Sequence, residues 1–249
     1  MKFLALIPAR YASTRFPGKP LAMMAGKPMI QRVYERVASV FTDLAVCTDD
    51  DRIADAVRAF GGNVVMTSPS HSSGTDRCAE AYRNLRSSAD VVINIQGDEP
   101  FIDPGQLRAV MDIFISRPDT QLATIVRPFS PDGDYAELAD PNKPKVVTDT
   151  DGNALYFSRS VIPYLRGLPC EQWPSHHAYL THVGLYGYKA DTLQHITTLP
   201  RSPLEIAESL EQLRWLQAGY RIATAPSTAP TIGIDTPADL EKALTLLNL

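Results

Sequence analysis

Near its start, the sequence contains the stretch Phe3-Leu4-Ala5-Leu6-Ile7-Pro8-Ala9-Arg10-Tyr11-Ala12-Ser13-Thr14-Arg15-Phe16-Pro17-Gly18-Lys19. The apolar run at its start predicts a buried strand over residues 3–7. The loop that follows holds a glycine and two prolines, which let backbone N–H groups turn inward, while Arg10, Arg15 and Lys19 supply positive charge. Such a loop is suited to hold an anion, above all phosphate oxygens. A solvated basic turn after a core strand is the alternative interpretation.

The segments after this loop alternate between strand and helix patterns. Apolar residues at helical spacing predict helices over residues 28–39, 53–60, 72–85, 103–116 and 204–219, and short apolar runs predict strands at 43–48, 63–66, 90–95 and 121–126. Strands that alternate with helices imply right-handed crossovers and a mostly parallel α/β sheet. Two further short strands, 145–147 and 154–157, flank a hairpin turn at Asp151-Gly152.

Bulk composition limits the class of protein. The 249 residues suffice for one large α/β domain, and a net charge of −4 argues against a nucleic-acid partner. Cys47, Cys78 and Cys170 form an odd set without C-x-x-C spacing, which is typical of a reducing compartment. No apolar run reaches the ~18 residues of a membrane span, and the apolar start is too short for a signal peptide. We therefore expect a soluble, cytoplasmic protein with no membrane partner.

Two aspartates follow the ends of predicted strands. Asp98 lies in Gln96-Gly97-Asp98-Glu99-Pro100, and Asp235 lies between the apolar residues 232–234 and a Thr236-Pro237 helix start. Open α/β sheets bind ligands at the carboxyl ends of their strands, and Mg²⁺ takes one or two carboxylates together with phosphate oxygens. A turn at Asp98 and a helix cap at Asp235 are the alternatives. The run 49–51 also resembles a metal site, but capping is the preferred interpretation for at least two of its three aspartates.

The segment Ser72-Ser73-Gly74-Thr75-Asp76-Arg77 opens a predicted helix. Its hydroxyl and acidic residues are ordinary N-cap residues, and capping alone would explain them. Gly74 would also allow a ligand to approach the backbone, and Arg77 could donate to a base or a phosphate.

Five motifs occur in a fixed order: L-I-P-A-R-Y-A-S-T-R-F-P-G-K-P at 6–20, H-x-S-G-T-D-R at 71–77, Q-G-D-E-P at 96–100, F-S-R with H-V-G-L-Y-G-Y-K at 157–159 and 182–189, and I-D-T-P-x-D-L at 234–240. Neither of the two commoner phosphate-binding loops, G-x-x-x-x-G-K-[ST] and G-x-G-x-x-G, occurs near the first motif. The ordered set resembles the nucleotidyltransferases that act on sugars. It is most similar to the CMP-sugar synthetases that activate 3-deoxy-manno-octulosonate (Kdo) with CTP.

The resemblance implies a doubly wound fold of the glycosyltransferase-A type. It also implies transfer of CMP from CTP to Kdo, with release of pyrophosphate, for lipopolysaccharide synthesis. Mg²⁺ would be the cofactor, held by Asp98 and Asp235.

The same resemblance assigns roles to individual residues. Catalysis would involve Arg10, Arg15, Lys19, Asp98 and Asp235, and the nucleotide would contact Pro8, Ala9, Arg10, Ser13, Arg15, Lys19, Gly74, Arg77 and Asp98. The sugar acid would contact Gln96, Arg159, His182, Tyr186 and Glu211. Without the resemblance, 183–188 would be an ordinary strand and Glu211 part of a solvated helix face.

We expect residues 1–249 to form a single nucleotidyltransferase domain with an insertion at about 128–188. The insertion is rich in turn residues yet too apolar for a linker, so we assign it to acceptor binding and to a homodimer interface. Residues 165–176 match no motif. Two other functions stay open: a cytidylyltransferase for another acidic sugar, such as an amino-Kdo or a sialic acid, and a non-catalytic nucleotide-binding regulator.

Overall fold

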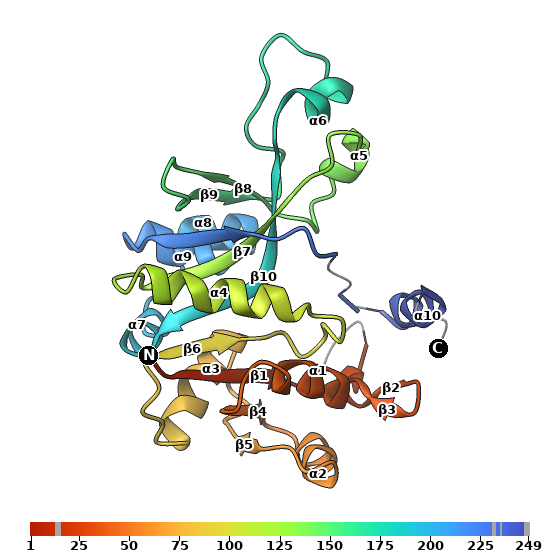
Figure 1. Ribbon diagram of the computed structural model, residues 1–249, viewed down its shortest axis with the longest axis vertical. Helices are drawn as coiled ribbons and strands as arrows, with labels where there is room; N and C mark the ends of the chain where they lie inside the picture. Colours follow the sequence, from red (N-terminus) through yellow and green to blue (C-terminus); the bar gives the residue numbers. More distant parts are fainter. Residues whose placement is uncertain (13–15, 231–232, 235, 247–249) are drawn as a thin grey trace. The chain divides into compact units, whose positions relative to one another are not determined.

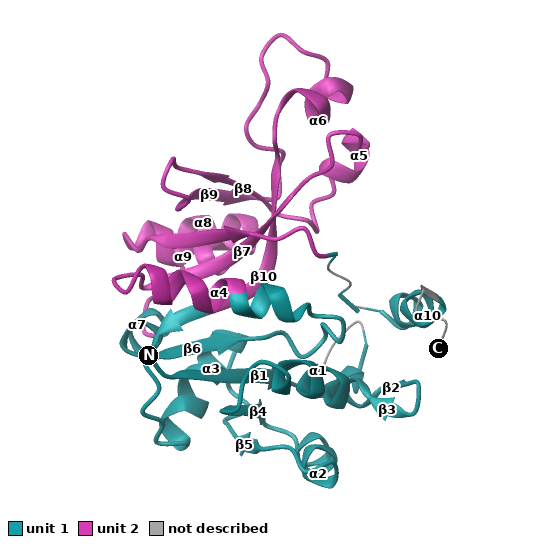
Figure 2. Ribbon diagram, in the orientation of Figure 1, with its two compact units in different colours: residues 1–108, 187–197, 230–249 teal, residues 109–186, 198–229 magenta. Residues whose placement is uncertain are grey.

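The structure is a computed structural model, and it describes residues 1–12, 16–230, 233–234 and 236–246. The chain forms two compact units (Figure 2). Unit 1 comprises residues 1–108, 187–197 and 230–249, and unit 2 comprises residues 109–186 and 198–229. Strands and helices alternate through the chain, as the sequence predicts, and the fold is α/β with a mostly parallel sheet.

Unit 1 is built on parallel strands that lie side by side in the order β6-β1-β4-β5 (Figure 1). These are β1 (Phe3–Ala9), β4 (Leu44–Thr48), β5 (Val64–Met66) and β6 (Val91–Asn94). In the register of β1, Ala5 lies opposite both Leu44 of β4 and Ile93 of β6. The residues of β4 and β6 are all buried, and all of them are apolar except Thr48 and Asn94 at the ends of the strands.

Three helices make the crossovers of unit 1: α1 (Met29–Ala38), α2 (Asp51–Ala59) and α3 (Gly74–Asn84). The chain passes outward from β1 through β4 to β5, and then returns to β6 on the other side of β1. The strand order therefore reverses between β1 and β6. In doubly wound sheets such a switch point is where ligands bind.

Capping residues fix the starts of two of these helices. Asp50 accepts a hydrogen bond from the backbone N–H of Arg52 (3.0 Å), and Ser73 accepts one from that of Asp76 (3.1 Å). The capping interpretation is confirmed for both residues. The helices α2 and α3 therefore begin within two residues of the predicted starts at 53 and 72.

Elements from the first and the last sequence segments of unit 1 pack together. The short strands β2 (Met23–Met24) and β3 (Lys27–Pro28) and the terminal helix α10 (Pro237–Leu246) surround a cluster of Met24, Met29, Ile234 and Ala243. The predicted strand ending at Ile234 is wrong, because Gly233 and Ile234 lie in no strand. The N–H of Ile234 instead donates to the carbonyl of Asp98 (3.1 Å). Unit 1 also contains the 3-10 helix η1 (Lys19–Leu21) and α7 (Ala190–Ile196), which the sequence did not predict.

In unit 2, β7 (Leu122–Pro128) pairs in parallel with β11 (Ile222–Pro226), a strand that the sequence did not predict. The hairpin of β8 (Lys145–Thr148) and β9 (Ala154–Ser158) is confirmed, and Gly152 supplies a positive φ of 76° in its turn. The long strand β10 (Leu180–Lys189) pairs antiparallel with β8 and belongs to unit 2 as far as residue 186. The helix α4 (Pro104–Ser116) likewise divides between the units, at residue 108.

The segment predicted as an insertion carries its own small core. Phe129, Leu138, Trp173 and Tyr179 form a buried cluster around the helices α5 (Tyr135–Leu138) and α6 (Trp173–His176), with the 3-10 helix η2 (Cys170–Gln172) before α6 (Figure 1). This cluster gives residues 165–176 a packing role. The assignment of the segment to acceptor binding and dimerisation stays a prediction. Over the described ranges, no helix has the length and apolar character needed to cross a membrane.

The predicted single helix over 204–219 is wrong. The chain forms two helices, α8 (Pro203–Glu208) and α9 (Gln212–Gln217), because Ser209 adopts a left-handed conformation with φ 50°. A buried ion pair joins them: Arg214 donates from Nε (2.8 Å) and a terminal nitrogen (2.9 Å) to the two oxygens of Glu205. Glu205 also completes a capping box with Ser202.

We predict that Arg214→Met lowers the free energy of unfolding by about 3–5 kcal/mol, because it leaves the buried Glu205 carboxylate without its partner. Denaturant unfolding measures the change. The matched control is Arg201→Met. Arg201 also contacts Glu205, at 3.3 Å, but its side chain is 62% exposed, so its loss should cost less than about 1 kcal/mol. Equal costs for the two variants would contradict the assignment of Glu205–Arg214 as the joint between α8 and α9.

Candidate functional site

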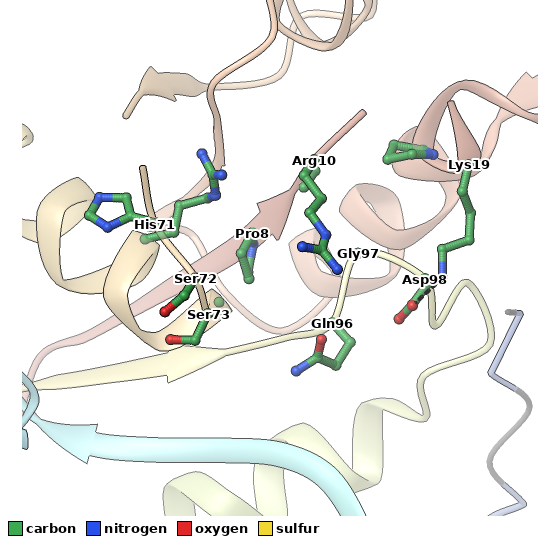
Figure 3. Close-up of a pocket in the computed structure, with 13 residues that line it drawn as sticks. Pro8, Arg10, Lys19, His71, Ser72, Ser73, Gln96, Gly97 and Asp98 are labelled. Carbon is green, nitrogen blue, oxygen red and sulfur yellow. Dashed lines mark hydrogen bonds and ion pairs between the residues drawn. The ribbon is translucent and has the colours of Figure 1, made fainter. Parts of the chain in front are cut away.

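A cavity of about 280 Å³ lies in unit 1 at the carboxyl ends of β1 and β6 (Figure 3). Three segments of the chain form its wall: the end of β1 with the loop after it, the start of α3, and the loop after β6. The lining residues are Pro8, Ala9, Arg10, Lys19, Pro20, His71, Ser72, Ser73, Gly74, Arg77, Gln96, Gly97 and Asp98. The cavity therefore occupies the switch point of the sheet, where the fold predicts a ligand.

Two glycines allow the wall segments to approach β1 closely. A Cβ atom on Gly97 would lie 2.9 Å from the carbonyl oxygen of Pro8, and one on Gly74 would lie 3.1 Å from the Pro8 ring. The N–H of Ile95 continues the ladder to Leu6 (3.0 Å), so the chain stays against β1 until it reaches the loop. The glycine in the Q-G-D-E-P motif is thus required by backbone packing.

Lys19 and Asp98 form an ion pair inside the cavity, with Lys19 Nζ 2.5 Å from Asp98 Oδ2. The two side chains are 11% and 31% exposed, so solvent screens the pair only in part. Gly18, with φ 72° and its N–H bonded to the carbonyl of Tyr11 (2.9 Å), turns the loop back so that Lys19 points at Asp98 (Figure 3). The negative charge at the end of β6 is therefore balanced by a cation from the loop after β1.

Glu99, next to Asp98, is buried with 9% exposure. Burial, with a smaller effect of the neighbouring Asp98 charge, raises the pKa of Glu99 to about 8. Glu99 is therefore mostly protonated at neutral pH, and Asp98 carries the negative charge of this acidic pair.

Arg10 and Arg77 lie in the same wall but in different surroundings. Arg10 is exposed and extends from the end of β1 into the space between Pro8 and Asp98 (Figure 3). Arg77 is only 4% exposed; it donates to Thr67 Oγ1 (2.6 Å) and forms an ion pair with Asp49 (3.1 Å). Arg10 is thus free to turn toward an entering anion, whereas Arg77 is a fixed part of the wall.

Three predicted site residues, Ser13, Arg15 and Asp235, lie outside the described residues. The residue before Asp235 is described, and its N–H donates to the carbonyl of Asp98. The backbone of Ile234 is thus in direct contact with the loop that carries Asp98.

The structure adds Pro20, His71, Ser72, Ser73 and Gly97 to the predicted lining residues. The His71–Ser73 segment could have been found, because it stands directly before the helix start that the sequence singles out. Its position depends on Glu80 of α3, which accepts from the N–H of Ser68 (2.9 Å) and also bonds the His71 ring.

The predicted sugar contacts divide between the two units. Gln96 lines the cavity of unit 1, whereas Arg159, His182, Tyr186 and Glu211 belong to unit 2. Arg159 donates to three backbone carbonyls: those of Glu208 (2.6 Å), Pro141 (2.7 Å) and Ser209 (3.2 Å). Glu211 precedes α9 and lies 3.8 Å from Arg214.

The other two predicted sugar contacts, His182 and Tyr186, form an aromatic group in unit 2. The ring of His182 packs against Phe157 (5.0 Å between centroids) and Tyr186 (5.2 Å), and its Nε2 lies 3.0 Å from Thr124 Oγ1. Burial lowers the pKa of His182 to about 3. His182 is therefore neutral at physiological pH and can contribute a hydrogen bond but no positive charge.

The donor set of the cavity suits a hard cation. Within the part of the chain that the structure describes, no three His, Cys, Asp or Glu side chains gather as a metal cluster. The cavity instead offers the Asp98 carboxylate, whose oxygen is already matched to a positive charge by Lys19. One carboxylate beside a loop that carries Arg10 and Lys19 fits Mg²⁺, which takes its remaining ligands from phosphate oxygens and water.

Comparison with known proteins shows the family to which the chain belongs. A family model described as cytidylyltransferase matches residues 4–222. The 3-deoxy-manno-octulosonate cytidylyltransferase of Parabacteroides distasonis is 57% identical over 248 residues, which cover 99% of this chain and 98% of that protein. The protein of the same name from Bacteroides thetaiotaomicron is 59% identical over 243 residues, or 98% and 97% of the two chains.

A solved structure of CMP:2-keto-3-deoxy-manno-octonic acid synthetase complexed with CTP matches with a TM-score of 0.91 and 46% identity, covering 100% of this chain and 99% of that one. The likeness in sequence and in fold thus extends over nearly the whole length of both proteins. This chain therefore belongs to the cytidylyltransferase family, in the branch of the 3-deoxy-manno-octulosonate cytidylyltransferases.

Proposed function

We propose that the protein transfers CMP from CTP to the anomeric hydroxyl of Kdo, giving CMP-Kdo and pyrophosphate. The observation that carries this proposal is the cavity at the switch point, where Lys19 and Asp98 meet 2.5 Å apart beside Arg10. Cations that face a carboxylate in one cavity suit the joint binding of a triphosphate and a cation. The names of its relatives, and the CTP in a solved structure that is 46% identical, support the choice of substrates.

The chemistry needs no nucleophile from the protein. The anomeric hydroxyl of the sugar attacks the α-phosphorus in line, and the bond to pyrophosphate breaks. Arg10 and Lys19 bind the phosphate oxygens and offset the charge that develops on the leaving pyrophosphate, and Arg15 has the same role in this proposal. Catalysis then rests on positioning and on charge that is in place before the reaction.

Asp98 and Asp235 would hold Mg²⁺, which supplies additional positive charge on the phosphate oxygens. The contact between the Ile234 N–H and the Asp98 carbonyl supports this pairing, because it brings the residue before Asp235 against the Asp98 loop. Protonation of Glu99 leaves the cavity with one charged carboxylate in this loop.

On the acceptor side, we assign the sugar carboxylate to Arg159 and the sugar hydroxyls to His182, Tyr186, Glu211 and Gln96. A guanidinium has five N–H donors. The hydrogen bonds of Arg159 to three carbonyls fix its plane and leave N–H groups for the carboxylate. We also propose a cytoplasmic homodimer that dimerises through the insertion, where Tyr164 is 72% exposed.

Pyrophosphate release tests the proposed function. The purified protein is supplied with CTP, UTP, GTP or ATP, each with and without Kdo, in the presence of Mg²⁺. Release that requires both CTP and Kdo is the expected result. Release of pyrophosphate only with amino-Kdo or a sialic acid as acceptor would show that the substrate is that acidic sugar and not Kdo. No release with any pair would leave only nucleotide binding.

We predict that Asp98→Asn and Asp235→Asn each remove most of the activity and leave the fold intact, because each keeps the size of the side chain and loses a charge. Steady-state rates and circular dichroism measure the two properties. Asp112→Asn, on the exposed face of α4, is the control. If a higher Mg²⁺ concentration restores the wild-type rate to the two variants, these carboxylates have only a peripheral role. If the wild-type protein keeps its full rate in excess chelator, the reaction needs no metal ion.

We predict that Lys19→Ala lowers kcat/KM for CTP by about 10²–10³, the usual loss when one preorganised charge donor is removed. Arg15→Ala should act similarly. Lys27→Ala is the matched control, because Lys27 pairs with Glu35 at the surface (2.7 Å) and lines no part of the cavity. Losses below about fivefold for both Lys19 and Arg15 would make the loop a solvated basic turn.

We predict that the protein sediments as a dimer, at twice the monomer mass of 27.4 kDa. The physical reason is the exposed Tyr164 ring next to the small core of the insertion. Symmetric dimers are also the commonest soluble oligomers. Sedimentation at micromolar concentration measures the mass. A monomer at that concentration would remove the dimer from the proposal.

A further inference from the structure

The break between α8 and α9 has no cause in the local sequence. Ser209 has φ 50° and ψ 46°, a left-handed conformation that residues other than glycine rarely adopt. The residues on both sides of it are ordinary helix formers, and the sequence predicts a helix that runs through. Tertiary contacts must therefore hold the chain in this shape, and the Glu205–Arg214 ion pair between the two helices is one of them.

A second set of bonds at the break comes from the end of β9 and the residue after it. The Glu208 carboxylate accepts from the hydroxyl of Ser158 (2.7 Å) and from the backbone N–H of Arg159 (2.9 Å). In return, the Arg159 guanidinium donates to the carbonyls of Glu208 (2.6 Å) and Ser209 (3.2 Å). Four hydrogen bonds thus join Ser158, the last residue of β9, and Arg159, which follows it, to the two residues at the break.

A buried lysine pairs with the end of β9. Lys145, opposite Ser158 in the β8–β9 pairing, has no exposed surface. Burial lowers the pKa of Lys145, while the charges of Asp140 and Glu208 act in the opposite direction. The Glu208 carboxylate therefore contributes both hydrogen bonds and charge to the end of β9.

The same corner organises the residues that we assign to the sugar acid. Arg159 is bonded to it directly, and Glu211 follows Ser209 by two residues at the start of α9. Trp215 of α9 packs edge-on against Tyr186 (5.2 Å, 82°), and Tyr186 in turn contacts the His182 ring. Arg159 is thus linked to the break itself, and the other three residues are linked to α9, which follows it.

We propose that Glu208 is the positioning residue of the acceptor site: it fixes the break between α8 and α9 and the direction of Arg159, and it acts on the sugar acid only through them. This inference rests on the proposed function and deepens it. It predicts a selective defect, because the Glu208 contacts lie in unit 2 and the nucleotide cavity is lined by unit 1.

Glu208→Gln is the main test. The amide keeps the size of the side chain but loses the charge and one of the two acceptor oxygens that Ser158 and Arg159 require. We expect the KM for Kdo to rise about tenfold or more, the usual cost of leaving one such group unpaired, with the KM for CTP within about twofold of wild type. Glu208→Asp should recover part of the loss. Glu137→Gln is the control, since Glu137 pairs with Lys143 at the surface of the same unit (2.8 Å).

A merely structural role would instead lower the melting temperature and the fraction of active protein, and leave both KM values unchanged. If Glu208→Gln does not fold, Ser158→Ala decides, because it removes only the hydroxyl that donates to Glu208. Ser158→Ala should also raise the KM for Kdo and not the KM for CTP, but by a smaller factor than Glu208→Gln. An unchanged KM for Kdo in the variants that fold, or an equal rise for CTP, overturns the inference.

The wild-type assay separates this inference from the proposed function. If the wild-type protein releases no pyrophosphate from CTP and Kdo, the proposed function fails and the inference fails with it. If the wild type is active and the variants show no selective change, only the role of Glu208 is lost.

Discussion

The parallel pairing of β1 with both β4 and β6 is the constraint on which the site depends. Because β1 and β6 run in the same direction, their carboxyl ends deliver Arg10 and the loop of residues 96–98 to one edge of the sheet. The chain must then pass very close to β1, and Gly97 makes this possible, since a side chain there would collide with the Pro8 carbonyl. The fold thus creates the cavity before any side chain contributes chemistry.

Charge within the cavity is arranged in advance of any ligand. Lys19 balances Asp98, while burial keeps Glu99 mostly protonated. Arg10 remains exposed at the end of β1. An entering triphosphate therefore meets cations that are already directed into the cavity, which is the condition under which electrostatic stabilisation is largest.

The sequence predicted the crossover helices and the buried strands because their apolar spacing is set by local periodicity. The resemblance to the CMP-sugar synthetases also assigned Lys19, Gly74 and Asp98 to the nucleotide, and all three line the cavity. The break at Ser209 could not be predicted, because the bonds that impose it come from Arg159, fifty residues earlier. The expected strand before Asp235 failed for a similar reason: Ile234 bonds to the Asp98 carbonyl rather than to a ladder. Both errors arise where tertiary hydrogen bonds override local preference.

A crystal structure of the protein with bound CTP tests the central claim most directly, because the claim concerns where the triphosphate binds. The account predicts phosphate oxygens within hydrogen-bond distance of Arg10 and Lys19. It also predicts that Lys19 Nζ has exchanged the Asp98 carboxylate, now 2.5 Å away, for a phosphate. CTP bound outside the cavity between the ends of β1 and β6, or bound there with the Lys19–Asp98 pair unchanged and no phosphate on either cation, would contradict it.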